Sequence, residues 1–126
     1  MTKYIICIAF FLCMIACTNY KDVPEYDIIE NKKYDAPVKS QITLRVSLKD
    51  STTTNEQIKT LTELLANSSM QIKMNKHPKP THVFIYVYKT KASYEANSGD
   101  WLSMYSKIGT DDTGKYTYHL PADPIK

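Results

Sequence analysis

The chain has 126 residues, of which 43% are hydrophobic, and its 16 Lys plus Arg against 13 Asp plus Glu give a formal net charge of +3. That length suits one small domain, since typical domains have roughly 100–150 residues. Nucleic-acid surfaces use arginine for bidentate contacts, whereas Arg45 is the only arginine here and the lysines alternate with acids, so we expect no nucleic-acid partner.

Residues 1–16 begin with one positive charge, Lys3, and continue with an unbroken apolar run over residues 5–16. A membrane-spanning helix needs about 20 apolar residues, which this run does not reach. Its length is typical of the apolar region of a secretory signal peptide. A buried core helix is the alternative, but a helix that is apolar on every side suits it poorly. We therefore predict a signal peptide over residues 1–16.

The end of this run, Met14-Ile15-Ala16-Cys17, resembles the lipobox of bacterial lipoproteins, in which a small residue precedes a lipidated cysteine. The resemblance implies cleavage before Cys17 and a diacylglyceryl group on its thiol. It also implies a location in the bacterial cell envelope, on the outer membrane or facing the periplasm if the cell is Gram-negative. Two or more acyl chains, such as palmitate, are enough for stable membrane anchoring. Membrane attachment through Cys17 is the expected partner interaction at this end of the chain.

The other cysteines, Cys7 and Cys13, precede the predicted cleavage point, and none follows Cys17. The mature chain would therefore have neither an internal disulfide nor a thiolate metal site. Residues 17–38 then mix charges, prolines and isolated apolar residues with no helical or strand period. This pattern predicts the lipidated cysteine followed by a flexible tether. Residues 39–126 remain as the folded domain.

The domain opens with strict alternation of apolar and polar residues over residues 42–49, which predicts a strand with one buried face. Thr53 and Glu56 then fit a capping box at the start of a helix. We expect this helix over about residues 54–67, with its apolar stripe against the sheet. The stripe consists of Ile58, Leu61 and Leu65.

Four later segments also have strand patterns. Residues 70–74 alternate and predict a short edge strand, which the prolines of the next loop must end. Residues 83–88 are apolar on both faces, as expected at the centre of a sheet. Residues 101–108 and 115–120 flank a polar turn and predict a hairpin. The order β-α-β-β-β-β indicates an α+β fold, with two layers: a mostly antiparallel sheet of four to five strands and one helix on one face.

Three histidines are the candidate metal ligands: His77, His82 and His119. Prolines separate the first two, and the spacing fits no helical arrangement of ligands, so we expect no metal site and no cofactor. With three glycines the chain has no phosphate-binding loop, and it contains no G-x-S-x-G nucleophile motif. We therefore expect that the protein is not an enzyme.

Aromatic residues are dense in the second half of the chain. If the helix covers the side chains of Val83, Ile85 and Val87, the opposite face of the sheet displays aromatic rings. Such a face is either a recognition surface or a second packing layer, covered by the tether or by another copy of the chain. The candidate interaction residues are Phe84, Tyr86, Tyr88, Trp101 and Tyr105.

These observations predict an envelope-anchored lipoprotein with a small, non-catalytic binding domain. Its partner would be another protein or a second copy of the chain. One alternative is an inhibitor or immunity-type lipoprotein that neutralises an envelope-acting enzyme. Another is a histidine-dependent metal-binding enzyme.

Overall fold

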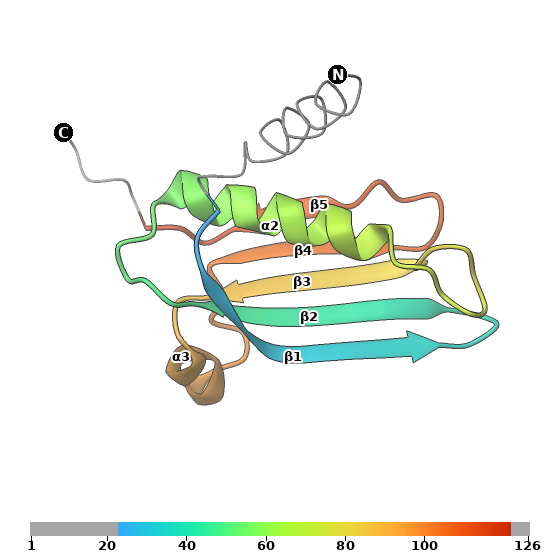
Figure 1. Ribbon diagram of the computed structural model, residues 1–126, viewed down its shortest axis with the longest axis horizontal. Helices are drawn as coiled ribbons and strands as arrows, with labels where there is room; N and C mark the ends of the chain where they lie inside the picture. Colours follow the sequence, from blue (N-terminus) through green and yellow to red (C-terminus); the bar gives the residue numbers. More distant parts are fainter. Residues whose placement is uncertain (1–22, 122–126) are drawn as a thin grey trace, which may run out of the picture.

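The computed structural model describes residues 23–121, so the predicted signal peptide and Cys17 lie outside the described residues. Five strands form one open sheet in the order β1-β2-β3-β4-β5, and a long helix, α2, lies across one face (Figure 1). The predicted α+β fold class, a mostly antiparallel sheet with one main helix, is confirmed. No helix within residues 23–121 has the length and apolar character needed to cross a membrane. The elements are β1 (Tyr26–Asp35), β2 (Ser40–Leu48), α2 (Asn55–Met70), β3 (His82–Tyr88), α3 (Lys91–Ala96), β4 (Ser103–Ile108) and β5 (Lys115–Tyr118).

The core lies between α2 and the sheet face that it covers. Alternate side chains of β2 and β3 point to this side because successive residues of a strand face opposite ways. The apolar stripe of α2 packs on them, as the sequence predicts. The buried cluster contains Leu44, Val46, Leu48, Ile58, Leu61, Leu65, Ala66, Val83, Ile85, Val87 and Tyr105.

The C-terminal part of the predicted tether is instead the edge strand β1. Residues 26–35 pair with β2 in antiparallel register, and a β-bulge between Ile28 and Glu30 shifts that register. The bulge hides the strand in the sequence, because it interrupts the period-two alternation. An edge strand can also carry charges on both faces, as this one does. The prediction of a flexible tether over 17–38 is therefore wrong for residues 26–35.

The predicted strand over residues 70–74 is also wrong. α2 continues to Met70, Gln71 is its C-cap, and residues 71–81 have no regular structure. With no strand between α2 and β3, the helix becomes a crossover and β2 pairs with β3 in parallel. The other three strand pairs are antiparallel. The observed order is therefore β-β-α-β-α-β-β rather than β-α-β-β-β-β.

The capping box at the start of α2 lies one residue later than predicted. Thr54 is the N-cap: its hydroxyl accepts from the backbone N–H of Gln57, whose side chain accepts from the Thr54 N–H. Thr53 donates instead to the carbonyl of Asp50, in the turn before the helix. The predicted hairpin at the C-terminal end is present, with β4 and β5 paired antiparallel.

Candidate interaction surface on the open face of the sheet

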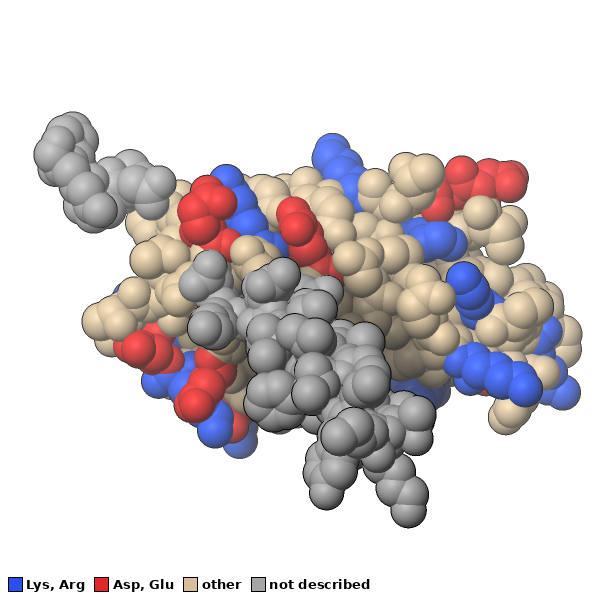
Figure 2. Space-filling model, turned by 45° about the horizontal axis from the view of Figure 1, so that its top comes forward, with Lys and Arg blue, Asp and Glu red and all other residues tan. Residues whose placement is uncertain are grey.

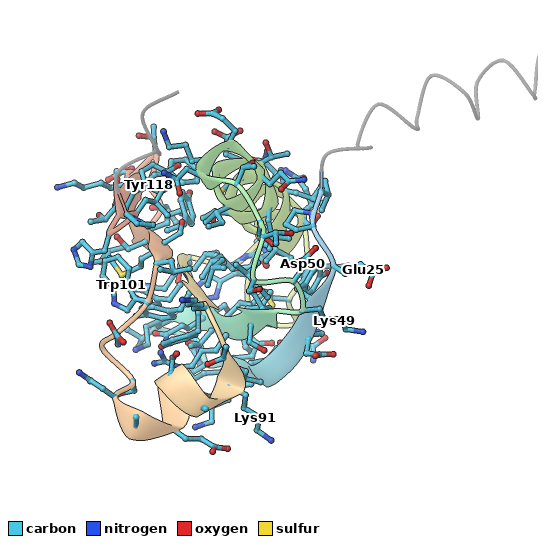
Figure 3. All side chains as sticks on the ribbon, turned by 90° about the vertical axis from the view of Figure 1, so that its left-hand side faces the viewer. Glu25, Lys49, Asp50, Lys91, Trp101 and Tyr118 are labelled. Carbon is cyan, nitrogen blue, oxygen red and sulfur yellow. The ribbon has the colours of Figure 1, made fainter. Side chains whose placement is uncertain are left out.

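The face of the sheet opposite α2, here called the open face, consists of three rows of cross-strand neighbours. In Figure 3, α2 and α3 lie on opposite sides of the sheet, and Trp101 points away from α2. The first row contains Glu30, Arg45, Tyr86, Met104 and Thr117. The second contains Lys32, Thr43, Phe84, Ser106 and Lys115. The third contains Tyr34, Gln41, His82 and Ile108.

Three of the five candidate aromatic residues lie on or beside this face with part of their surface exposed. Phe84 and Tyr86 are half-buried at the middle of the sheet. Trp101, just before β4, is also half-buried, and its ring centroid lies 6.5 Å from that of Tyr86. The structure therefore brings these three rings to one side of the sheet, as expected from the alternation of β3.

Tyr105 is not on the open face, and this prediction is wrong. It pairs with Ile85 and points with it toward α2, where it is only 1% exposed. Its hydroxyl lies 3.0 Å from the sulfur of Met70 and 3.1 Å from the carbonyl oxygen of Thr113. These partners satisfy the phenol inside the core, so β4 presents its aromatic residue inward and Met104 outward.

Tyr88 has the orientation expected from β3 but is fully buried. Tyr94 of α3 packs edge-on against it, with 5.1 Å between the ring centroids, and the Tyr88 hydroxyl donates to the carbonyl of Ser98. The short helix α3, between β3 and β4, thus covers one end of this face. Tyr88 is thus buried beneath the surface residues and is not available to a partner. Its assignment as an interaction residue is therefore wrong.

Arg45 is the charged centre of the open face. Its Nε donates to Glu30 at 3.1 Å, and Nη1 donates to the hydroxyl of Tyr88. The guanidinium stacks over the ring of Tyr86, 4.2 Å from its centroid, and lies 5.7 Å from that of Tyr94. A guanidinium fixed by an ion pair and by aromatic rings is preorganised to bind an anion with its remaining donors.

Glu30 is shared between two cations. Its second oxygen lies 2.7 Å from the ammonium of Lys32, and this hydrogen bond, followed by the charges of Lys32 and Arg45, holds the pKa of Glu30 below its usual range. The carboxylate is therefore ionised at neutral pH and neutralises one cation. Since the three rows contain Arg45, Lys32 and Lys115 against Glu30, the open face has a positive excess.

Each of the three histidines has its own hydrogen-bond or ring partner in the structure. His77 and His82 bond through Nδ1 to Ser40 and Thr81 respectively, while His119 stacks on Trp101 with 4.2 Å between the ring centroids. Within residues 23–121, no group of three or more His, Cys, Asp or Glu side chains is placed to hold a metal ion.

No family model, curated protein or solved structure matches this chain. The surface is therefore interpreted from its own residues. Reasoning from the sequence missed Arg45 and Met104 as members of it. The outward position of Arg45 follows from the alternation of β2, but its place beside Tyr86 depends on the parallel pairing of β2 with β3.

Proposed function

We propose that the protein is a lipid-anchored lipoprotein of the bacterial cell envelope whose domain binds a protein partner through the open face. The observation that carries this proposal is the half-exposed group of Phe84, Tyr86 and Met104 on neighbouring central strands. Aromatic residues, methionine and arginine are enriched in protein interfaces, with the apolar centre surrounded by polar residues. Arg45 beside Tyr86 and the lysines at the sheet edges give the open face this composition.

Charge favours a partner with an acidic surface over a second copy of the chain. Lys32 and Lys115 lie at opposite sides of the second row, and Arg45 lies in the first. A two-fold symmetric pair would bring these cations toward those of the other copy, which opposes association. An acidic partner would instead complement the lysines, and a carboxylate would reach the free donors of Arg45.

The position of the predicted anchor supports binding on the side away from the membrane. Val23, the first described residue, packs against the core on the α2 side of the sheet. The chain from Cys17 to Val23 extends at most about 20 Å, because a residue spans about 3.3–3.6 Å. A lipid at Cys17 would thus hold the domain close to the bilayer by its helix side, and the open face would point away from it.

Photo-crosslinking in cells that make the full-length protein tests the proposed surface. A benzophenone amino acid in place of Phe84 is expected to give a discrete crosslinked product that mass spectrometry identifies as an acidic protein. The matched control places the same group at Ile28, which is 58% exposed on β1. Tyr86→Ala should weaken the crosslink at residue 84 at least several-fold, because it removes an aromatic contact worth about 1–2 kcal/mol or more.

Each alternative gives a different crosslinking result. A product containing two copies of the chain would indicate that the open face mediates self-association and not binding to a different protein. Equal products from residues 84 and 28 would mean that the open face has no special role. The melting temperature of Tyr86→Ala, compared with that of the wild type, reports whether the variant is folded.

Lipidation at Cys17 has its own test. Cells that make the wild type and receive a radiolabelled fatty acid are expected to label the protein, and Cys17→Ser should abolish the label, because serine has no thiol to form the thioether. Cys13→Ser is the matched control, since it changes a cysteine that the predicted cleavage removes. Equal labelling of the wild type and Cys17→Ser would refute the anchor without bearing on the open face.

A further inference from the structure

The loop over residues 71–81 has no regular structure, yet hydrogen bonds fix it to the end of the β1–β2 hairpin. Asp35 accepts from the backbone N–H of Asn75 at 2.8 Å and from that of Lys76 at 3.2 Å. These bonds, after that from the Ser40 hydroxyl, hold the pKa of Asp35 below its usual range. A long loop held in this way forms a rigid wall, as a binding site requires.

Ser40 also positions His77 in this loop. Its buried hydroxyl lies 2.6 Å from Asp35 and 2.6 Å from Nδ1 of His77. Because the ionised carboxylate only accepts, the hydroxyl proton goes to Asp35 and Nδ1 of His77 is the donor to Ser40. This hydrogen bond at Nδ1 orients the ring, and His77 also lines the space beside the loop.

That space is a cavity of about 450 Å³, within the range of small-ligand sites, at roughly 300–1,000 Å³. Met70, Pro78 and Pro80 supply apolar walls. The ionisable residues that line it are His77, Lys79 and Lys107, and none of the lining residues is acidic.

Lys107 is held in place at this cavity. Its ammonium donates to the carbonyl oxygens of Thr81, at 3.2 Å, and Gly109. An ammonium has three donors, so one remains for a ligand. Lysine side chains lie on the right-hand side of Figure 2, and an acidic group lies above them at the same end. The lining of the cavity itself contains basic and no acidic side chains, which favours the entry of anions.

We propose that this cavity binds a small carboxylate with a compact apolar body, an aromatic acid or a short fatty acid. The carboxylate would pair with Lys79 and Lys107, and the apolar body would lie against Met70 and the prolines. The positive lining disfavours a cationic ligand, and the apolar walls disfavour acetate or inorganic phosphate. This site is separate from the open face, so the proposal does not depend on the proposed function.

Methyl NMR of the full-length protein in detergent micelles tests the proposal at the site itself. Phenylacetate is expected to shift the methyl signal of Met70 in a saturable way, with a dissociation constant in the millimolar range or below, while that of Met104, on the open face, stays in place. 2-Phenylethylamine and acetate should bind at least about tenfold more weakly, which corresponds to about 1.4 kcal/mol. A parallel titration with octanoate, compared with phenylacetate, shows whether the site prefers a ligand with an acyl chain or one with an aromatic ring.

Variants of the lining lysines give the second test. Lys79→Gln and Lys107→Gln should each weaken phenylacetate about tenfold, as expected for a hydrogen bond to a charged group. Lys73→Gln is the matched control, because Lys73 is exposed in the same loop and does not line the cavity. Lys79→Gln removes no hydrogen bond within the protein that the structure records, so it separates ligand binding from folding if Lys107→Gln proves unstable.

Three results would overturn the proposal. One is the absence of a saturable shift at Met70 with either acid. Another is equal affinity for phenylacetate and 2-phenylethylamine, which would indicate an apolar hollow without charge selection. The third is an equal loss of affinity in Lys79→Gln and Lys73→Gln. It would indicate that the electrostatic field at this end of the molecule attracts the anion without a specific site.

Discussion

Leu61→Ala is expected to lower the free energy of unfolding by ~2–5 kcal/mol, as for buried leucines generally. Leu61 is fully buried in the middle of α2 and belongs to the cluster between the helix and the sheet. The substitution removes apolar contacts and leaves a cavity that the surrounding side chains fill only in part. Because small domains have only about 5–15 kcal/mol of total stability, this loss is a large share of it.

The matched control is Leu64→Ala, the same change on the same helix at a half-buried position. It should cost less than about 1.5 kcal/mol, since less apolar surface returns to water. Urea unfolding of the two variants and the wild type, followed by circular dichroism, measures both costs. Equal losses would contradict the assignment of Leu61 to the centre of the core, and a larger loss for Leu64→Ala would mean that the helix packs by another face.

The elements that the sequence predicts well are those whose side-chain pattern is set by burial. In β2, apolar and polar residues alternate because one face meets α2, and in α2 the stripe through Leu61 recurs at the helical period. β3 is apolar on both faces, but only its α2 side and Tyr88 are fully buried, while Phe84 and Tyr86 stay partly exposed on the open face. The patterns of β2 and α2 are thus a direct record of which sides lose contact with water, and the outer side of β3 is not.

β1 leaves no such record. It is an edge strand whose side chains remain largely exposed, and its bulge after Ile28 moves the later residues to the opposite face. The residues at 70–74 give the opposite error, because Met70 and Met74 are buried or partly buried without belonging to a strand. Periodicity over five residues cannot distinguish a helix end and a loop from an edge strand.

For the candidate surface, the alternation of β4 predicts that Ser103 and Tyr105 share one face and Met104 the other. It does not determine which face meets the helix. The structure places Ser103 against α2, where its hydroxyl lies 2.6 Å from that of Thr62. The small side chains of this pair allow the helix to approach β4, and Tyr105 follows to the same side. Which face of β4 meets α2 depends on packing between segments that are distant in the sequence. The local pattern of β4 contains no information about that packing.

The inward position of Tyr105 leads to the second large effect, which is expected for Gly114→Ala. Gly114 has φ +89°, a region that L side chains rarely adopt, and a methyl group there would lie well inside contact distance of the Tyr105 phenol. The phenol cannot move away freely, because it is buried and bonded to the carbonyl of Thr113. Backbone strain and overpacking together should lower the free energy of unfolding by about 2–4 kcal/mol.

Gly109→Ala separates these two causes. Gly109 also has a positive φ, of +83°, but nothing lies within 4 Å of a methyl group at that position. Its substitution should therefore cost only the backbone strain, about 1 kcal/mol. Thermal unfolding of both variants gives the comparison, and the difference between them measures the contact with Tyr105. If the two variants lose equal stability, then Tyr105 yields at no cost, and the β4–β5 turn does not help to hold its ring in the core.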